Sequence, residues 1–214
     1  MREKNIQARP FLKWAGGKGQ LLEQFQVRFP TELNGKGIIK RYYEPFLGSG
    51  AVFFWIMQNC KIEKAYINEF NPEIYLCYVA IQKNVEQVIK HLRNLENKYH
   101  RLDLAAQEAF YYQVRDKYNQ TRRNIDFIRY NMKKFPERAA MTIFLNRTCF
   151  NGLYRMNSKD EFNVPFGRYK NPTICDSWNL RSVSRVLRGV LITNNDFSVI
   201  QKHKTRGRFC GFSS

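Results

Sequence analysis

The sequence has no long apolar run, few histidines and no paired cysteine motif. No stretch of about 18 consecutive apolar residues occurs in its 214 residues, so no transmembrane helix is expected. Residues 1–10 are polar and charged, which argues against a secretory signal peptide. The three histidines stand too far apart for a histidine-rich metal site, so no metal is expected. Five scattered cysteines without a CxxC pair predict a reduced, cytoplasmic protein.

Acidic residues are also scarce, because 18 Asp and Glu stand against 36 Lys and Arg, a net charge of +18. This excess indicates a polyanionic partner, with a ribosomal or membrane-surface protein as the alternative. Residues 1–100 hold 15 basic and 9 acidic groups, and residues 101–214 hold 21 and 9, so the second half is expected to carry most of a nucleic-acid surface. A hydrophobic share of 43% predicts a folded core rather than a disordered chain.

The first half of the chain is typical of an α/β fold. Residues 41–44 and 65–69 have the composition of strands, and an apolar helix is expected over residues 51–57 after the glycines at 48–50. This order of strand, glycine turn, helix and strand predicts a parallel sheet. The pair Asn71-Pro72 predicts the start of another helix, and a last strand is expected at residues 190–193.

Between these strands the apolar spacing becomes helical. A helix is expected over residues 84–100, a second is marked by Phe110, Val114 and Tyr118, and a third begins at Pro136. We interpret the three apolar stripes as core packing. Because three successive helices break the alternation of strand and helix, they predict a helical insertion. Residues 150–172 have no helical period and predict a hairpin or an ordered loop.

The glycine turn at residues 48–50 is suited to a nucleoside ligand. Glycines after a strand allow close backbone approach and present N–H groups at a helix start. Glu69 ends the next strand, 19 residues beyond Gly50, where an acid can accept both ribose hydroxyls. Phe53 replaces the third glycine of the dinucleotide fingerprint, and residues 15–19 lack the Ser or Thr of a phosphate loop. A plain turn and a dehydrogenase-like nucleotide binder remain as alternatives.

Four segments in order carry a family resemblance: residues 10–18 (PFLKWAGGK), 44–50 (EPFLGSG), 150–155 (FNGLYR) and 161–169 (EFNVPFGRY). Together they resemble the Dam-type adenine-specific DNA methyltransferases, from about residue 9 to residue 209. The resemblance implies a Rossmann-like methyltransferase sheet with an inserted helical and β-hairpin target-recognition subdomain, the C-terminal part of the sheet being missing. It divides the chain into a cofactor-binding part (1–83), the recognition subdomain (84–178) and a return to the catalytic domain (179–214).

The family resemblance implies S-adenosylmethionine as the cofactor. The residues expected to bind it are Trp14, Lys18, Phe46, Gly48, Gly50, Glu69, Asp196 and Phe197. Trp14 and Lys18 would lie over the cofactor, the glycines beneath it, and Asp196 and Phe197 beside its adenine. A sulfonium cation that carries a carboxylate suits such a mixture of lysine, acid and aromatic rings.

The recognition subdomain is expected to bind double-stranded DNA. The residues that the resemblance implies are Phe150, Asn151, Leu153, Arg155, Pro165 and Arg168. The two arginines suit guanine or phosphate, and Asn151 suits adenine. Phe150 suits a wedge where the target adenine leaves the stack, with core packing as the alternative. A GATC-like site and a restriction–modification setting are expected on the resemblance alone.

The Asp-Pro-Pro-Tyr motif of the family is absent from the sequence. In the family it holds the adenine amino group and stacks on the flipped base, and it would begin a few residues after Phe209. No proline follows Pro172 and no acid follows Asp196, so no catalytic residue is assigned. We expect a truncated or frameshifted copy that is catalytically incomplete. A non-catalytic DNA-binding remnant of such an enzyme is the alternative.

Overall fold

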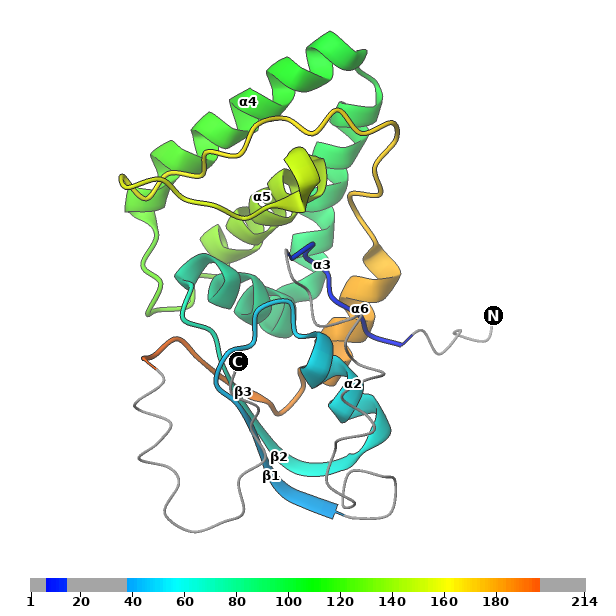
Figure 1. Cartoon of the computed structure of the whole chain (residues 1–214), viewed down its shortest axis with the longest axis vertical. Helices are drawn as coiled ribbons and strands as arrows, with labels where there is room; N and C mark the ends of the chain where they lie inside the picture. The colour runs from blue at the N-terminus through cyan, green and yellow to red at the C-terminus, as the bar shows by residue number, and fades with distance from the viewer. Residues whose placement is uncertain (1–6, 15–37, 197–214) are drawn as a thin grey trace.

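The computed structural model describes residues 7–14 and 38–196 (Figure 1). Within these ranges, two layers are apparent, a small sheet with its helices at one end of the molecule and a group of longer helices at the other. The helices are α2 (Ala51–Asn59), α3 (Pro72–His100), α4 (Leu104–Thr121), α5 (Lys134–Thr148) and α6 (Ser177–Val186), with short 3-10 turns η3 (Arg122–Asn124) and η4 (Phe150–Gly152).

The described strands form a parallel sheet, as the sequence predicts. They are β1 (Ile38–Glu44), β2 (Lys61–Asn68) and β3 (Leu191–Thr193), in the order β1-β2-β3. Tyr43 lies opposite Tyr66, and their rings stack with centroids 4.7 Å apart. Since all three strands run in the same direction, their carboxyl ends meet at one edge of the sheet.

Helix α2 begins at the glycine turn, where the sequence analysis expects it. Gly50 is its N-cap in the left-handed conformation, and Phe53, Phe54 and Ile56 are buried. Burial of three large apolar side chains in nine residues fixes this short helix against the core, because each contributes about 1.5–3 kcal/mol when fully buried.

Helix α3 joins two helices that the sequence analysis treats as separate. It runs from Pro72 to His100, and Asn71 caps it by accepting hydrogen bonds from the N–H groups of Glu73 and Ile74. The backbone leaves helical geometry only at Asn84, with φ −154° and ψ 60°. The chain therefore kinks at this one residue, which is neither glycine nor proline, and then continues as a helix.

The two other predicted insertion helices are present and pack on α3. Phe110, Val114 and Tyr118 of α4 are buried, as their spacing predicts. Helix α5 begins at Lys134, two residues before the predicted start, because Pro136 lies in the first turn, where a missing N–H leaves no helical hydrogen bond unmade. Helix α3 has its most extensive contacts with α5, which lies at the centre of the inserted helices.

Helix α6 is a correction to the sequence analysis, which assigns no helix to residues 177–186. Asp176 caps it by accepting a hydrogen bond from the Asn179 N–H at 3.0 Å. Leu180 and Val183 are buried against the core, and Leu187 follows in the same register. The signal was present as an Asp cap followed by apolar residues at helical spacing, within an otherwise polar stretch.

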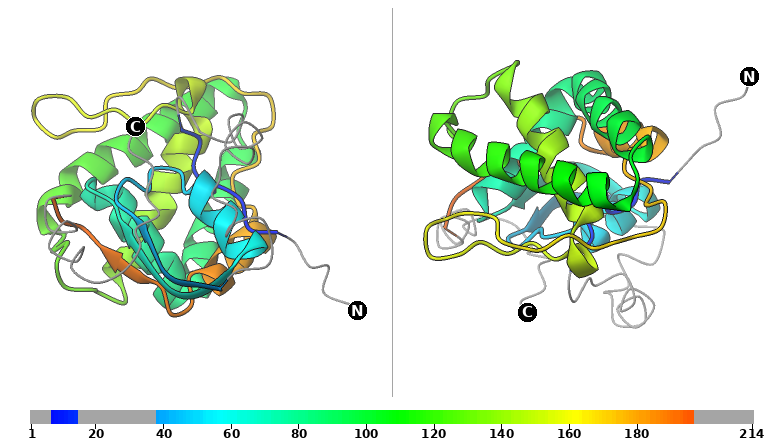
Figure 2. Two further views of the ribbon diagram at one scale, coloured as in Figure 1. Left: turned by 60° about the horizontal axis from the view of Figure 1, so that its bottom comes forward. Right: turned by 90° about the horizontal axis from the view of Figure 1, so that it is seen from above.

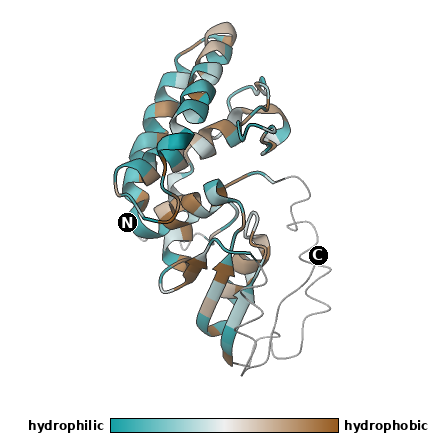
Figure 3. Ribbon diagram, turned by 90° about the vertical axis from the view of Figure 1, so that its left-hand side faces the viewer, coloured by the Kyte–Doolittle hydropathy of each residue, from teal (hydrophilic) through white to brown (hydrophobic). Residues whose placement is uncertain are grey.

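Two further views show how the segment after α5 lies (Figure 2). It leaves α5 at Thr148, runs as an extended loop beside the inserted helices, and returns to α6. Coloured by hydropathy, the helices at the end of the molecule away from the sheet carry many hydrophilic residues (Figure 3). Among the helices of the described ranges, none is both long enough and apolar enough to cross a membrane.

Candidate cofactor and nucleic-acid site

The carboxyl ends of the three strands form one continuous edge. The Glu69 N–H donates to the Thr193 carbonyl at 3.0 Å, which joins the end of β2 to the end of β3. Asn194 Nδ2 donates to the carbonyls of Glu69 and Phe70, and Asn68 Nδ2 donates to the Asn195 carbonyl. The sequence segments expected to surround the cofactor therefore meet in space, although they lie more than 120 positions apart.

The glycine turn after β1 requires glycine at two positions. Gly48 has φ +53° and Gly50 has φ +74°, in the left-handed region that L side chains rarely adopt. A Cβ on Gly50 would also lie 2.7 Å from Tyr78 Oη and 3.0 Å from the Phe54 ring. The Tyr78 hydroxyl donates to the Gly48 carbonyl at 3.1 Å, so the turn is held from below by α3.

Glu69 presents a buried carboxylate beside this turn. Oε2 accepts a hydrogen bond from the Gly48 N–H at 2.8 Å, and Oε1 accepts one from the Asn71 N–H at 2.9 Å. The residue is only 7% exposed. Burial raises the pKa of Glu69, and the hydrogen bonds from the Asn71 and Gly48 N–H groups offset part of that rise. The acid expected to meet the ribose is therefore bound to the glycine turn itself.

Of the remaining predicted cofactor residues, three lie within the described ranges and two lie outside them. Trp14 lies over the turn, since its Nε1 is 3.7 Å from the position of a Cβ on Gly48. Phe46 and Asp196 are exposed at the same edge. Lys18 and Phe197 lie outside the described residues. The edge thus offers a ligand a buried acid, two positive-φ glycines and an indole ring.

Three side-chain amides hold the segment 7–14, which carries Trp14. Gln58, Asn179 and Asn146 each accept a hydrogen bond from a backbone N–H of this segment and donate one to the carbonyl of the same residue, at Ala8, Arg9 and Lys13 respectively. Each side-chain amide therefore makes the pair of backbone hydrogen bonds that a residue of a neighbouring strand would make. Sequence reasoning missed these residues. The one signal was an amide in otherwise apolar helix positions, such as Asn146 after Phe144 and Leu145.

Residues 149–167 form the ordered, hairpin-like loop that the sequence predicts. Isolated antiparallel bridges join Cys149 to Phe166 and Met156 to Phe162. The Phe150 N–H donates to the Pro165 carbonyl at 2.8 Å, between these bridges. Alternate side chains on the returning arm, those of Phe162, Val164 and Phe166, are buried, which fixes the loop against the inserted helices.

The predicted DNA-binding residues lie mainly on the outer side of this loop. Phe150 is 50% exposed, which argues against its alternative interpretation as a core residue. Asn151, with φ +52°, and Pro165 are exposed, whereas Leu153 is half-buried. A large apolar ring exposed next to a polar amide, on a loop joined by backbone bridges, is suited to contact with stacked bases.

The two arginines of the loop are exposed and have different neighbours. Arg155 Nε donates to Asn163 Oδ1 at 2.9 Å across the two arms. Arg168 has φ +51° and lies 3.5 Å from a carboxylate oxygen of Glu108 on α4. Arg155 is therefore positioned by the loop itself, and Arg168 by the helix beneath it.

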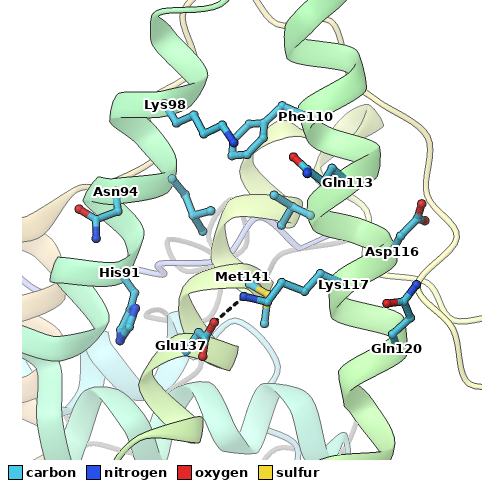
Figure 4. A pocket seen from close by; sticks show the side chains of 12 residues that line it. His91, Asn94, Lys98, Phe110, Gln113, Asp116, Lys117, Gln120, Glu137 and Met141 are labelled. Carbon is cyan, nitrogen blue, oxygen red and sulfur yellow. Dashed lines mark hydrogen bonds and ion pairs between the residues drawn. The ribbon is translucent and has the colours of Figure 1, made fainter.

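A groove of about 610 Å³ lies elsewhere, between α3, α4 and α5 (Figure 4). Three of its charged residues already contact other side chains, since Lys117 Nζ lies 2.7 Å from Glu137 Oε1 and Lys98 Nζ lies 4.5 Å from the centre of the Phe110 ring. None of the predicted cofactor or DNA residues lines it, so it is separate from the edge described above.

A strand-end edge with glycines and a buried acid, next to a loop with exposed arginines and an exposed aromatic ring, is compatible with a nucleic-acid-modifying enzyme of α/β fold. Residues 14–210 match the family described as D12 class N6 adenine-specific DNA methyltransferase. The chain belongs to this family, whose members are enzymes. Membership removes the dehydrogenase-like alternative.

Individual relatives agree with this assignment. The chain is 42% identical to the Type II methyltransferase M.MjaIII of Methanocaldococcus jannaschii over 97% of the chain and 68% of that protein. It is 37% identical to the Type II methyltransferase M1.LlaDCHI of Lactococcus lactis over 99% of the chain and 67% of the relative. It is 34% identical to the DNA adenine methylase of Haemophilus influenzae over 77% of the chain, which spans about half, 49%, of that protein.

Proposed function

We propose that the chain provides the cofactor-binding and target-recognition parts of a site-specific adenine DNA methyltransferase. The reaction is transfer of a methyl group from S-adenosylmethionine to the exocyclic amino group of an adenine flipped out of duplex DNA, at a GATC-like site. The division at residues 83/84 and 178/179, the cytoplasmic location and a cognate restriction endonuclease belong to the same proposal.

The observation that carries the proposal is the joining of the strand-end edge to the recognition loop. Trp14, above the glycine turn, stacks on Tyr154 of the loop with ring centroids 6.3 Å apart and planes 14° apart. A cofactor bound at the edge would therefore lie next to the loop that meets the DNA. Methyl transfer needs this adjacency, because donor and acceptor must approach within bonding reach.

The residues at the edge fit S-adenosylmethionine. The Glu69 carboxylate retains further acceptor capacity after its two backbone hydrogen bonds, and both ribose hydroxyls are donors. The Trp14 ring suits the sulfonium cation. When bound, the cofactor supplies an electrophilic methyl group, and the part of the chain described here orients it. Lys18, Phe46, Gly48, Gly50, Asp196 and Phe197 complete the proposed cofactor site.

The loop residues fit double-stranded DNA. Exposed Arg155 and Arg168 offer bidentate donors, Asn151 offers an adenine-reading amide, and Phe150 offers the wedge. Leu153 and Pro165 shape the apolar surface beside it. We place no catalytic residue among the 214, because the sequence contains no Asp-Pro-Pro-Tyr motif. We propose that this chain by itself binds DNA and cofactor without transferring the methyl group.

The experiment measures binding and transfer separately with the 214-residue chain. Calorimetry with S-adenosylhomocysteine tests the cofactor site, and fluorescence anisotropy of a labelled GATC duplex tests the loop. We expect both to bind and no transfer of a labelled methyl group to DNA. Failure of both ligands to bind contradicts the proposed function. Methyl transfer by this chain alone contradicts the catalytic incompleteness but supports the enzyme assignment.

A non-catalytic DNA-binding remnant is the second candidate, and the absent motif favours it. The DNA sequence beyond the codon for Phe209 separates the two. An Asp-Pro-Pro-Tyr sequence in another frame supports a frameshifted methyltransferase. Its absence in every frame supports the remnant.

A further inference from the structure

The side chain of Asn146 lies between the two halves of the proposed site. It projects from α5 and is fully buried, at 0% exposure. Its Oδ1 accepts from the Lys13 N–H at 2.7 Å, and its Nδ2 donates to the Lys13 carbonyl at 2.9 Å and to the Gly152 carbonyl at 2.8 Å. One amide thus joins the residue before Trp14 to the turn that follows Phe150.

The two halves also pack closely beside Asn146. A Cβ on Gly152 would lie 2.4 Å from Lys13 Cδ and 2.5 Å from its Cβ. Beside this contact, Trp14 stacks on Tyr154. We refer to Lys13, Trp14, Asn146, Gly152 and Tyr154 as the seam. Across it, the cofactor segment and the DNA loop share hydrogen bonds, a steric fit and a ring contact.

Asn146 differs from the other two amides that hold the segment 7–14. Gln58 and Asn179 also pair with this segment, but among the described residues neither donates to the DNA loop. The bond from Asn146 to Gly152 is not needed to hold the segment. It specifically fixes the loop to it.

We propose that Asn146 is a positioning residue that couples cofactor binding to DNA binding through the seam. This inference rests on the proposed function. A cofactor that packs on Trp14 favours the arrangement of the seam in which the loop is held against residues 7–14, and DNA contacts the loop in that same arrangement, so each ligand favours the conformation that the other binds. The coupling must be reciprocal, with each ligand raising the affinity for the other by the same factor.

The test is a thermodynamic cycle on the 214-residue chain. Anisotropy gives the dissociation constant of a GATC duplex with and without saturating S-adenosylhomocysteine, and calorimetry gives the reverse. We expect a coupling of about fivefold or more in the wild-type chain. Asn146→Asp keeps the size and the acceptor for the Lys13 N–H but removes both donations, and we expect the coupling to fall below about twofold.

Asn179→Asp is the matched control, because it removes one donation to the same segment away from the loop. It should lower the melting temperature yet retain the coupling. Tyr154→Leu tests the seam from the loop side and decides the question if Asn146→Asp does not fold. Ligands that both bind without coupling, or an equal loss of coupling in Asn179→Asp, overturn the inference alone. Failure of both ligands to bind the wild-type chain overturns the proposed function as well.

Discussion

Arg138 on α5 and Glu73 on α3 form a buried bidentate pair. The guanidinium Nε and Nη2 donate to Oε2 and Oε1 of the carboxylate at 2.9 and 2.6 Å, and each side chain is 1% exposed. The guanidinium also lies 3.6 Å from the centre of the Tyr118 ring. Because Glu73 stands in the first turn of α3, just beyond Glu69, this pair fixes the strand-end edge, where we propose that the cofactor binds, to the inserted helices.

Breaking this pair should be costly. Glu73→Gln leaves a buried guanidinium without its counter-charge, so we expect a loss of about 3–5 kcal/mol in the free energy of unfolding. The exposed pair of Arg181 and Glu86, with hydrogen bonds of 2.7 and 2.8 Å, is the control. Glu86→Gln should cost about 1 kcal/mol or less. Urea denaturation measures both, and equal losses would show that burial does not decide the effect.

Substitution of two glycines with the same φ can distinguish the cost of backbone strain from the cost of close packing. Gly50 and Gly189 share φ +74°, but a Cβ on Gly50 meets Tyr78 Oη at 2.7 Å, whereas a Cβ on Gly189 meets nothing within 4 Å. Gly189→Ala should therefore cost about 1–2 kcal/mol from conformation alone. Gly50→Ala should cost more, and it should also weaken S-adenosylhomocysteine binding, because the turn must shift. Equal costs from thermal melts would contradict the close approach.

The sequence predicted the parts of the fold that depend on local pattern. Helix α4 and the glycine turn before α2 could be predicted because residues close together in the sequence determine them. Helix α6 was missed because its apolar stripe is short, with Leu180, Val183 and Leu187 as its buried members in a segment that is otherwise mostly polar. The kink at Asn84 could not be predicted, because no glycine or proline stands at that position.

The site was predictable to the same extent. Gly48 and Glu69 follow strands and carry recognisable chemistry, so their proximity could be expected. The bond of Asn146 to Lys13 spans 133 positions, and no local pattern indicates it. An asparagine in an apolar helix signals a buried polar contact, but only the tertiary structure gives its partner.

Phe150 provides a test of the proposed role of the loop in DNA recognition. Phe150→Ala should leave the free energy of unfolding within about 0.5 kcal/mol, since half of the side chain is exposed. It should reduce the fluorescence gain of 2-aminopurine placed at the target adenine, because the wedge is lost. Ile128→Ala is the control, since Ile128 is 91% exposed and lies outside the loop. An unchanged gain in Phe150→Ala would exclude the wedge.

We expect Arg155 to contribute to sequence discrimination and not only to the electrostatic attraction between the protein and DNA. In Arg155→Ala, we expect discrimination between GATC and a singly substituted duplex to fall by about 1–3 kcal/mol. Lys159→Ala, at the exposed tip of the loop, should weaken binding to both duplexes equally. Competition anisotropy at fixed salt measures the difference. Uniform weakening in Arg155→Ala would assign the residue to a phosphate contact.

The pH dependence of cofactor binding should follow Glu69. Burial raises the pKa of this carboxyl, so it takes up a proton at a higher pH than an ordinary glutamate. Since the ionised form is the better acceptor for ribose hydroxyls, S-adenosylhomocysteine affinity should fall as the pH falls into the acidic range. Glu69→Gln should bind more weakly at neutral pH and lose this dependence.

The stability contribution of Glu69 should change in the opposite direction from its contribution to affinity. The folded chain holds the Glu69 proton more tightly than the unfolded chain, so acidification through the raised pKa favours the folded state. Glu86 provides the inverse control, because its hydrogen bond with Arg181 lowers its pKa and its contribution disappears as the pH falls. Free energies of unfolding for Glu69→Gln and Glu86→Gln, each compared with wild type across pH, should therefore diverge. Parallel curves would contradict the burial of the Glu69 carboxylate.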